Sequence, residues 1–163
     1  MNFCFENRVP LDRETVFAFH QNPARLELLH AGWSATRVLA HAGNIDLGAE
    51  TWIEVTLAGF LPLVIGFKHT VCEPPFRFGE EQIHGPFSRF IHEHQFEQEG
   101  YETLVRDILT VSLPWHYGGE FAMKRIVAPG IRRMFKNRAF SLSRLIADGT
   151  LNRCLRQNQS EEI

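Results

Sequence analysis

Two histidines lie between two phenylalanines in the segment FIHEHQF, residues 90–96. Alternate side chains of a β-strand share a face, so one face of this segment carries two aromatic rings and two imidazoles: Phe90, His92, His94 and Phe96. The aromatic rings mark this face as the buried one, and burying an imidazole without a hydrogen-bond partner costs about 2 kcal/mol or more. The two histidines therefore need partners, either within the protein or in a ligand.

Polar side chains in the two neighbouring segments are candidate partners. The segment FRFGEEQI places Glu80 and Gln82 on the same face as Phe78. In the segment YETLVRDILTVSL, Asp107 is the polar exception on an otherwise apolar face. A carboxylate and an amide from one strand and a carboxylate from the other are thus expected to point inward with the histidines.

The turn between the last two segments predicts which residues pair. We expect Glu99 and Gly100 to form a two-residue hairpin turn, because glycine supplies the positive φ that such turns need. This register places His92 directly opposite Asp107. Cβ atoms of directly paired residues are roughly 4.5 to 5.5 Å apart, so the sequence predicts a hydrogen-bonded His92–Asp107 pair.

Several kinds of chemistry are open to this polar cluster. Its members could satisfy one another and define the strand register inside the core. They could equally orient a ligand oxygen at the polar end of an apolar cavity. A histidine oriented by Asp107 could act as the general base that cyclisation or dehydration requires. A His-x-His pair beside a carboxylate could also hold a metal, but such clusters are more often structural and we expect neither a metal nor a cofactor.

The composition is that of a soluble globular domain. The chain has 163 residues, of which 44% are hydrophobic and 22% charged, enough for one domain with a sizeable core. A formal charge of -2 gives no electrostatic reason to expect nucleic acid. The N-terminus lacks the pattern of a secretory signal, and the longest apolar run, AGFLPLVIGF, is too short to cross a bilayer. The three cysteines include no CxxC pair. We therefore expect a cytoplasmic protein with no nucleic-acid partner and no stable membrane insertion.

Local patterns predict the element order β-α-α-β6-α. The segment NFCFENRV alternates as a strand, Asp12 caps a first short helix, and Pro23 begins a second. Between Ala35 and Leu113, six alternating runs separated by Gly, Pro and Asn predict an antiparallel meander. Apolar residues then recur at helical spacing as far as Gly149, although Pro129-Gly130 should kink or split this helix.

These elements predict an α+β fold in which a curved antiparallel sheet of about seven strands wraps around the long C-terminal helix. The apolar residues expected on the buried side of that helix are Phe121, Ile126, Met134 and Phe135. Space that the helix does not fill would form an apolar cavity. The domain is expected over residues 1–149, followed by a polar, frayed C-terminal tail over 150–163.

The sequence resembles the START-like, or SRPBCC, superfamily, and within it the bacterial polyketide cyclase/dehydrase-like branch. The residues that carry the resemblance are Phe78-x-Glu80-x-Gln82-x-x-Gly85-Pro86-Phe87, His92-x-His94-x-Phe96, Asp107, Pro114 and Gly118-Gly119. The resemblance implies a helix-grip fold around a hydrophobic cavity for lipids, polyketides or other apolar small molecules. It implies no particular reaction, because lipid carriers and enzymes share this fold.

The predicted function is binding of an apolar small molecule with a polar end. The alternative is a cyclase- or dehydratase-type enzyme in which His92 and Asp107 form a general-base pair in the same cavity. The predicted ligand-binding residues are the inward-facing ones and one loop tryptophan: Phe78, Glu80, Gln82, Phe90, His92, His94, Phe96, Asp107 and Trp115. The remaining histidines are expected at the surface or between helices: His20, His30, His41, His69, His84 and His116.

Overall fold

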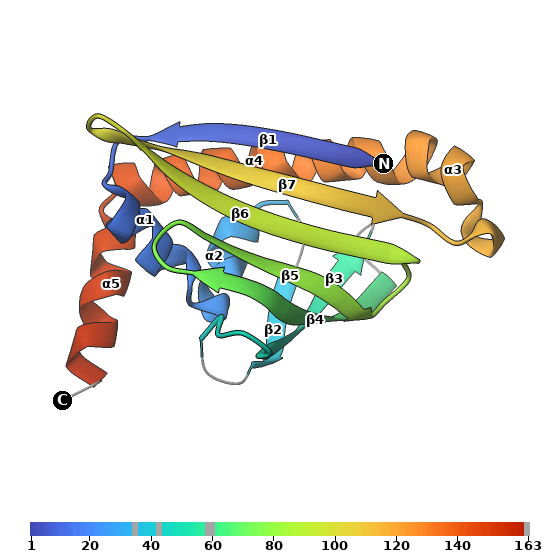
Figure 1. The fold of residues 1–163 in the computed structure, drawn as a ribbon, viewed down its shortest axis with the longest axis horizontal. Coiled ribbons are helices and arrows are strands. Elements are labelled where there is room, and N and C mark those ends of the chain that lie inside the picture. The colour runs from blue at the N-terminus through green and yellow to red at the C-terminus, as the bar shows by residue number, and fades with distance from the viewer. Residues whose placement is uncertain (34–35, 42–43, 58–60, 162–163) are drawn as a thin grey trace.

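The computed structural model describes residues 1–33, 36–41, 44–57 and 61–161, which form one curved sheet with helices against one face (Figure 1). Seven antiparallel strands make up the sheet in the order β1-β7-β6-β5-β4-β3-β2. The strands are β1 (Asn2–Val9), β2 (Thr36–His41), β3 (Glu50–Leu57), β4 (Leu61–Glu73), β5 (Arg77–His84), β6 (Arg89–Glu99) and β7 (Glu102–Ser112). The predicted α+β class and six-strand meander are confirmed, and the first strand joins the meander beside the last.

Eight helical segments accompany the sheet in the described part of the chain. They are α1 (Arg13–His20), η1 (Pro23–Arg25), α2 (Leu26–His30), η2 (Trp115–Tyr117), α3 (Gly119–Ala122), the π-helical η3 (Met123–Val127), α4 (Ala128–Ala147) and α5 (Thr150–Glu161). The predicted cap at Asp12 is confirmed, since its carboxylate accepts the backbone N–H of Thr15 at 2.7 Å. No helix within these described ranges is long and apolar enough to cross a membrane.

The long helix α4 lies across the concave face of the sheet, as the sequence predicts (Figure 1). Its buried side follows a stripe at intervals of three and four residues: Ile131, Phe135, Arg138, Leu142 and Leu145. Apolar members of such a stripe bury their surface against the strands and hold the helix in place. One member of this stripe, Arg138, is a charged residue.

The segment before α4 departs from the predicted pattern. Phe121 and Ile126 are 72% and 70% exposed, so the prediction that they face the sheet is wrong, whereas Phe135 is buried as expected. Pro129 lacks an N–H and its ring would crowd the carbonyl four residues earlier, and the π-helical η3 widens the helix just before it. This wider turn breaks the 3.6-residue period between Phe121 and Ala128, seven residues apart. Ile126 is five residues before Ile131 and so does not fall on the spacing of three and four residues.

The β6–β7 hairpin turns one residue later than predicted. Glu99 pairs with Glu102, so Gly100 and Tyr101 form the turn, and Gly100 has the positive φ of 64°. The Gln98 amide holds this geometry by donating to the carbonyls of Gly100 and Glu102. The predicted pairing is therefore wrong by two residues. Since side chains alternate with a period of two, such a shift leaves every residue on its predicted face.

The C-terminal segment is also more ordered in structure than predicted. Residues 150–161, expected to form a frayed tail, form the helix α5, and Leu151 is buried against the core. The predicted end of the preceding helix is confirmed, because Gly149 follows α4 with a φ of 72°. The division into a domain over 1–149 and a tail stays a prediction.

Candidate functional site

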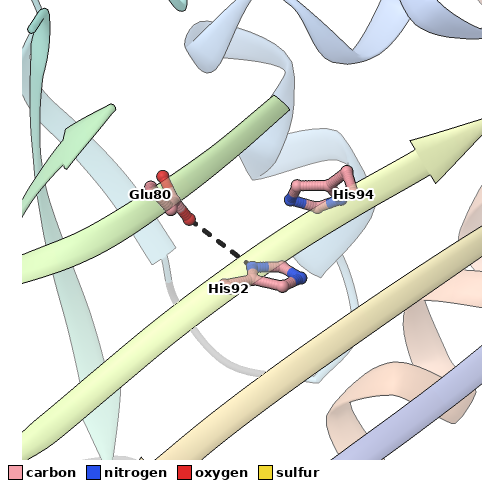
Figure 2. Close-up of side chains that lie close together, drawn as sticks. All are labelled: Glu80, His92 and His94. Atoms are coloured by element: carbon pink, nitrogen blue, oxygen red, sulfur yellow. Dashed lines mark ion pairs between the residues drawn. The ribbon is translucent and has the colours of Figure 1, made fainter. Parts of the chain in front are cut away.

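A cluster of ionisable side chains lies on the concave face, where β5, β6 and β7 run side by side. Glu80 of β5 lies directly across from His92 of β6, and His94 lies across from Asp107 of β7. His92, His94 and Asp107 are buried and Glu80 is half-buried. Figure 2 shows the three side chains from β5 and β6 converging on one side of the sheet. The structure thus brings together four of the predicted site residues.

His92 bridges the two carboxylates. Its Nε2 donates to Oδ1 of Asp107 at 3.0 Å, and its Nδ1 lies 3.5 Å from Oε1 of Glu80 (Figure 2). Burial by itself would lower the pKa of His92, but the hydrogen bonds to Asp107 and Glu80 outweigh it and raise the pKa above 6.5. The predicted His92–Asp107 hydrogen bond is confirmed, although the two residues are diagonal rather than directly opposite. His92 is therefore the cation between two carboxylates.

Both carboxylates are held in the ionised form by these neighbours. Burial would raise the pKa of Asp107, but the surrounding His94, Arg138 and His92 side chains hold it well below its usual value. Burial also opposes ionisation of Glu80, yet its interactions with His92 lower its pKa to about 2. The charge within this part of the site is thus largely compensated internally.

His94 differs from its neighbour in charge state. Burial, followed by the positive charge of His92, lowers the pKa of His94 to about 3. Its Nδ1 lies 2.7 Å from Oδ1 of Asp107, but the direction of approach is not that of a hydrogen bond, and Nδ1 is left without a partner. The ring stacks on Phe78 with centroids 4.3 Å apart. A neutral imidazole that contacts Asp107 without a well-directed hydrogen bond is therefore present beside the charged bridge.

Three members of the cluster have the composition of a metal site. One ligand atom from each of Glu80, His92 and His94 lies within 4.8 Å of the others, and two imidazoles with a carboxylate suit divalent transition metals. In this structure both ring nitrogens of His92 already face carboxylates. A metal bound by these three residues would therefore have to replace the proton on the His92 nitrogen that faces Glu80.

Two small pockets lie beside the cluster, between the sheet and the helices. The first, of about 40 Å³, is lined by residues that include Phe5, Asn7, Asp107 and Phe135. The second, of about 60 Å³, is lined by residues that include His69, Phe78, Glu80 and His94. Both pockets share three wall residues: His20, Leu29 and Arg138. In these two pockets, a ligand larger than a few atoms must therefore displace part of the shared wall.

The other predicted site residues lie at different places. Phe96 is buried in the core and lines neither pocket, and Phe90 packs against Phe67 and Phe87 in another part of the core. The Gln82 amide donates to the carbonyl of Phe87 at 2.8 Å and makes no contact with the histidines in the described chain. Trp115 is 86% exposed in η2, so the structure does not place it beside the cluster.

Sequence reasoning missed several residues that line the pockets. His69, expected at the surface, is buried on β4 with its Nε2 3.3 Å from Oγ1 of Thr51. The alternation Ile65, Phe67, His69 could have identified it as inward-facing. Arg138 could likewise have been found, because it lies three residues after Phe135 on the buried stripe of the helix. Charge made both residues look like surface positions.

The fold and the polar concave face define a helix-grip protein of the START type. A START superfamily protein from Mycobacterium smegmatis is 13% identical with a TM-score of 0.69, covering 90% of this chain and 97% of that one. Protein Ms6760 from the same organism is 12% identical with a TM-score of 0.70, covering 91% and 92%. The ginseng major latex-like protein 151 is 10% identical with a TM-score of 0.65, covering 88% and 95%. At these identities the similarity shows the fold alone.

The amino-acid sequence identifies the family of this protein, which the structural similarities alone do not. It belongs to the family described as polyketide cyclase / dehydrase and lipid transport, whose model matches residues 9–140. No curated protein sequence matches the chain. The predicted resemblance to this branch is confirmed, and the family description joins activities that all handle apolar small molecules.

Proposed function

We propose that this protein binds a small, mainly apolar molecule with a polar end on the concave face of the sheet. The observation that carries the proposal is the composition of the second pocket. Its walls combine apolar side chains, such as Phe19 and Phe78, with buried polar groups, such as His69 and His94. Small-molecule sites in proteins typically have this composition, in which a few polar groups orient an otherwise apolar ligand.

The neutral His94 ring is the group best suited to contact the polar end. It lines the pocket, it is uncharged near neutral pH, and its Nδ1, 2.7 Å from Oδ1 of Asp107, makes no well-directed hydrogen bond in the described residues. An imidazole can donate or accept a hydrogen bond, so it can meet either a hydroxyl or a carbonyl. Entry of a ligand requires the wall shared by the two pockets to move.

The enzymatic alternative, a cyclase or dehydratase with His92 as general base, is less well supported. His92 lines neither pocket, and its raised pKa favours the protonated ring, which has no lone pair to accept a proton. His94 does line the second pocket, but with a pKa of about 3 it is too weakly basic to take over this role near neutral pH. We therefore place ligand binding first.

Binding is tested by titrating the protein with Nile red, an apolar fluorescent dye, and by displacing the dye with naphthol and with naphthalene. We expect saturable dye binding and a preference for naphthol, which adds a hydroxyl to the same apolar body. The variant His94→Phe should stay folded, because it roughly keeps volume, and should lose that preference. The control is His84→Phe, an exposed histidine at the end of β5.

Native mass spectrometry of freshly purified protein, followed by solvent extraction, would identify a ligand retained from the cell. Absence of saturable dye binding together with absence of any retained small molecule would contradict the proposal. If a folded His94→Phe variant still prefers naphthol to naphthalene, His94 does not contact the polar end of the ligand, but the pocket can still be the binding site.

A further inference from the structure

Arg138 is buried in the middle of the helical layer. It lies on the face of α4 that meets the sheet, between Phe135 and Leu142 on the same stripe, and it is only 8% exposed. An arginine at such a position normally pairs with a carboxylate or donates to several carbonyls, because burying an unpaired charge is costly. The groups that accept hydrogen bonds from this guanidinium group therefore indicate whether Arg138 has a structural role.

The protein offers Arg138 no such partner. No residue in the described ranges accepts a hydrogen bond from its guanidinium group or lies within ion-pairing distance of it, and the one ring beneath it is that of Phe135, 5.1 Å away. The carboxylates that line the same pockets have other partners: His92 for Asp107 and Glu80, and Arg106 for Glu6. A guanidinium group has five N–H donors in a rigid planar fork, and here all of them are left for something other than the protein.

The guanidinium group also faces open space, since Arg138 is part of the wall between the two pockets. Two further donors without partners lie at the same pockets. The Nδ2 of Asn7 is buried at the first pocket, and the Nδ1 of His69 is buried at the second. When Thr51 donates to Nε2 of His69, the proton of this ring resides on Nδ1, which is then a donor.

We infer that Arg138 holds the carboxylate of an apolar carboxylic acid, so the polar end of the ligand is an anion. This inference rests on the proposed function, because it assigns the chemistry of the ligand in that same site. A carboxylate matches the guanidinium fork with two parallel hydrogen bonds, and Asn7 or His69 can donate a third. A neutral carbonyl or hydroxyl would leave part of the guanidinium fork without acceptors.

The carboxylates of the cluster are held by His92 and not by Arg138. Burial lowers the pKa of His94 and of His69 and keeps both rings neutral. The incoming carboxylate would thus be surrounded by one guanidinium group and neutral donors on the near side. The apolar body would lie against the ring of Phe135 and the side chain of Leu29.

The test compares naphthoate with methyl naphthoate, which share one apolar body and differ in charge, as displacers of Nile red near neutral pH. The native protein should bind the acid at least about tenfold more tightly than the ester, a difference within the range of one charged hydrogen-bonded pair. Arg138→Met should lose this preference by weakening binding of the acid while binding of the ester is retained. Arg133→Met, an exposed arginine on the same helix, is the control and should keep it.

The outcomes separate the two proposals. Equal binding of acid and ester by the native protein, or an unchanged preference in Arg138→Met, would overturn the role of Arg138 and leave the proposed pocket standing. Failure of Nile red and of both displacers to bind would instead overturn the proposed function. If Arg138→Met does not fold, Arg138→Gln, which keeps a planar donor but loses the charge, provides the same comparison.

Discussion

Two arginines of this protein are almost equally buried, Arg25 at 5% and Arg138 at 8% exposure, yet their surroundings are opposite. Arg25 ends η1 and donates to the carbonyls of Ala18, Phe19 and Cys154, at 2.9, 3.3 and 2.9 Å. It thereby ties α1 to α5, the helix that follows α4 at the end of the chain (Figure 1). Arg138, on the concave face, has no hydrogen bond within the described residues.

This difference separates a structural charge from one available to a ligand. Around Arg25 the protein supplies three carbonyl acceptors, so the guanidinium group stabilises the packing of α1 against α5. Around Arg138 it supplies apolar walls and donors such as Asn7 and His69, and the Glu80 and Asp107 carboxylates are held by His92 instead. The same residue type at the same burial therefore serves two purposes, and each can be tested by a matched substitution.

The largest expected effect comes from Asp107→Ala, which converts the satisfied part of the concave face into an unsatisfied one. It leaves the buried His92 with only the more distant Glu80, and breaking a buried pair on one side costs about 3 to 5 kcal/mol. Urea unfolding would measure this loss. The control is Glu99→Ala, which removes an exposed ion pair with Arg8 and should cost less than about 1 kcal/mol. Equal effects of the two variants would show that the cluster contributes no special stability.

A slightly smaller effect is expected for Arg25→Met. The substitution roughly keeps the apolar stem but leaves three buried carbonyls without their donor, at a cost of about 3 kcal/mol in the free energy of unfolding. Because these bonds join α1 to α5, hydrogen exchange should also accelerate in α5. A variant as stable as the native protein would show that Arg25 is not the structural arginine of the pair.

The pH dependence of stability tests the charge states assigned to the concave face. Burial lowers the pKa of His94 to about 3, of His30 to about 3 and of His20 to about 4, so below pH 6.5 the unfolded chain binds protons that the folded protein does not. Each such group reduces the free energy of unfolding by up to about 1.4 kcal/mol per pH unit as the pH falls from 6.5 toward its folded pKa.

His92 acts in the opposite direction. Its folded pKa lies above 6.5, so its stabilising contribution is complete below pH 6.5 and is lost as the pH rises through the folded value. Stability should therefore pass through a maximum near neutrality. His94→Phe should flatten the acid side by about the slope of one proton, and an unchanged slope in that variant would contradict a neutral His94 in the folded state.

The smallest effect on stability is expected for Arg138→Met, within about 1 kcal/mol of the native protein. Replacing a buried unpaired guanidinium group by an apolar side chain removes a desolvation cost while losing only its longer-range attraction to Asp107. Urea unfolding of the two methionine variants side by side checks this, with Arg25→Met as the destabilised reference. A large loss of stability in Arg138→Met would show that this arginine is structural as well.

Much of the fold could be predicted because its elements depend on local signals. Asp12 caps α1 by accepting the backbone N–H of Thr15, only three residues further along the chain. The alternation along β5 to β7 assigns each residue to a face of the sheet, whatever the register between the strands. The prediction that His92, His94 and Asp107 point inward is therefore correct, although the predicted pairing of β6 with β7 is wrong by two residues. The pattern failed at Phe121 because the π-helical turn before Pro129 interrupts the helical period.

The sequence by itself determined the element order, the buried faces and the presence of ionisable groups on the concave side, since each follows from spacing along one segment. Only the tertiary structure decided which of those groups have partners. His92 is satisfied because β5 and β7 bring a carboxylate to each ring nitrogen. Arg25 and Arg138 both look like surface residues in the sequence, and what distinguishes them is the presence of carbonyls from α1 and α5 around one and their absence around the other in the described chain. Hydrogen-bond satisfaction depends on atoms brought together from distant segments, and spacing along a single segment carries no information about it.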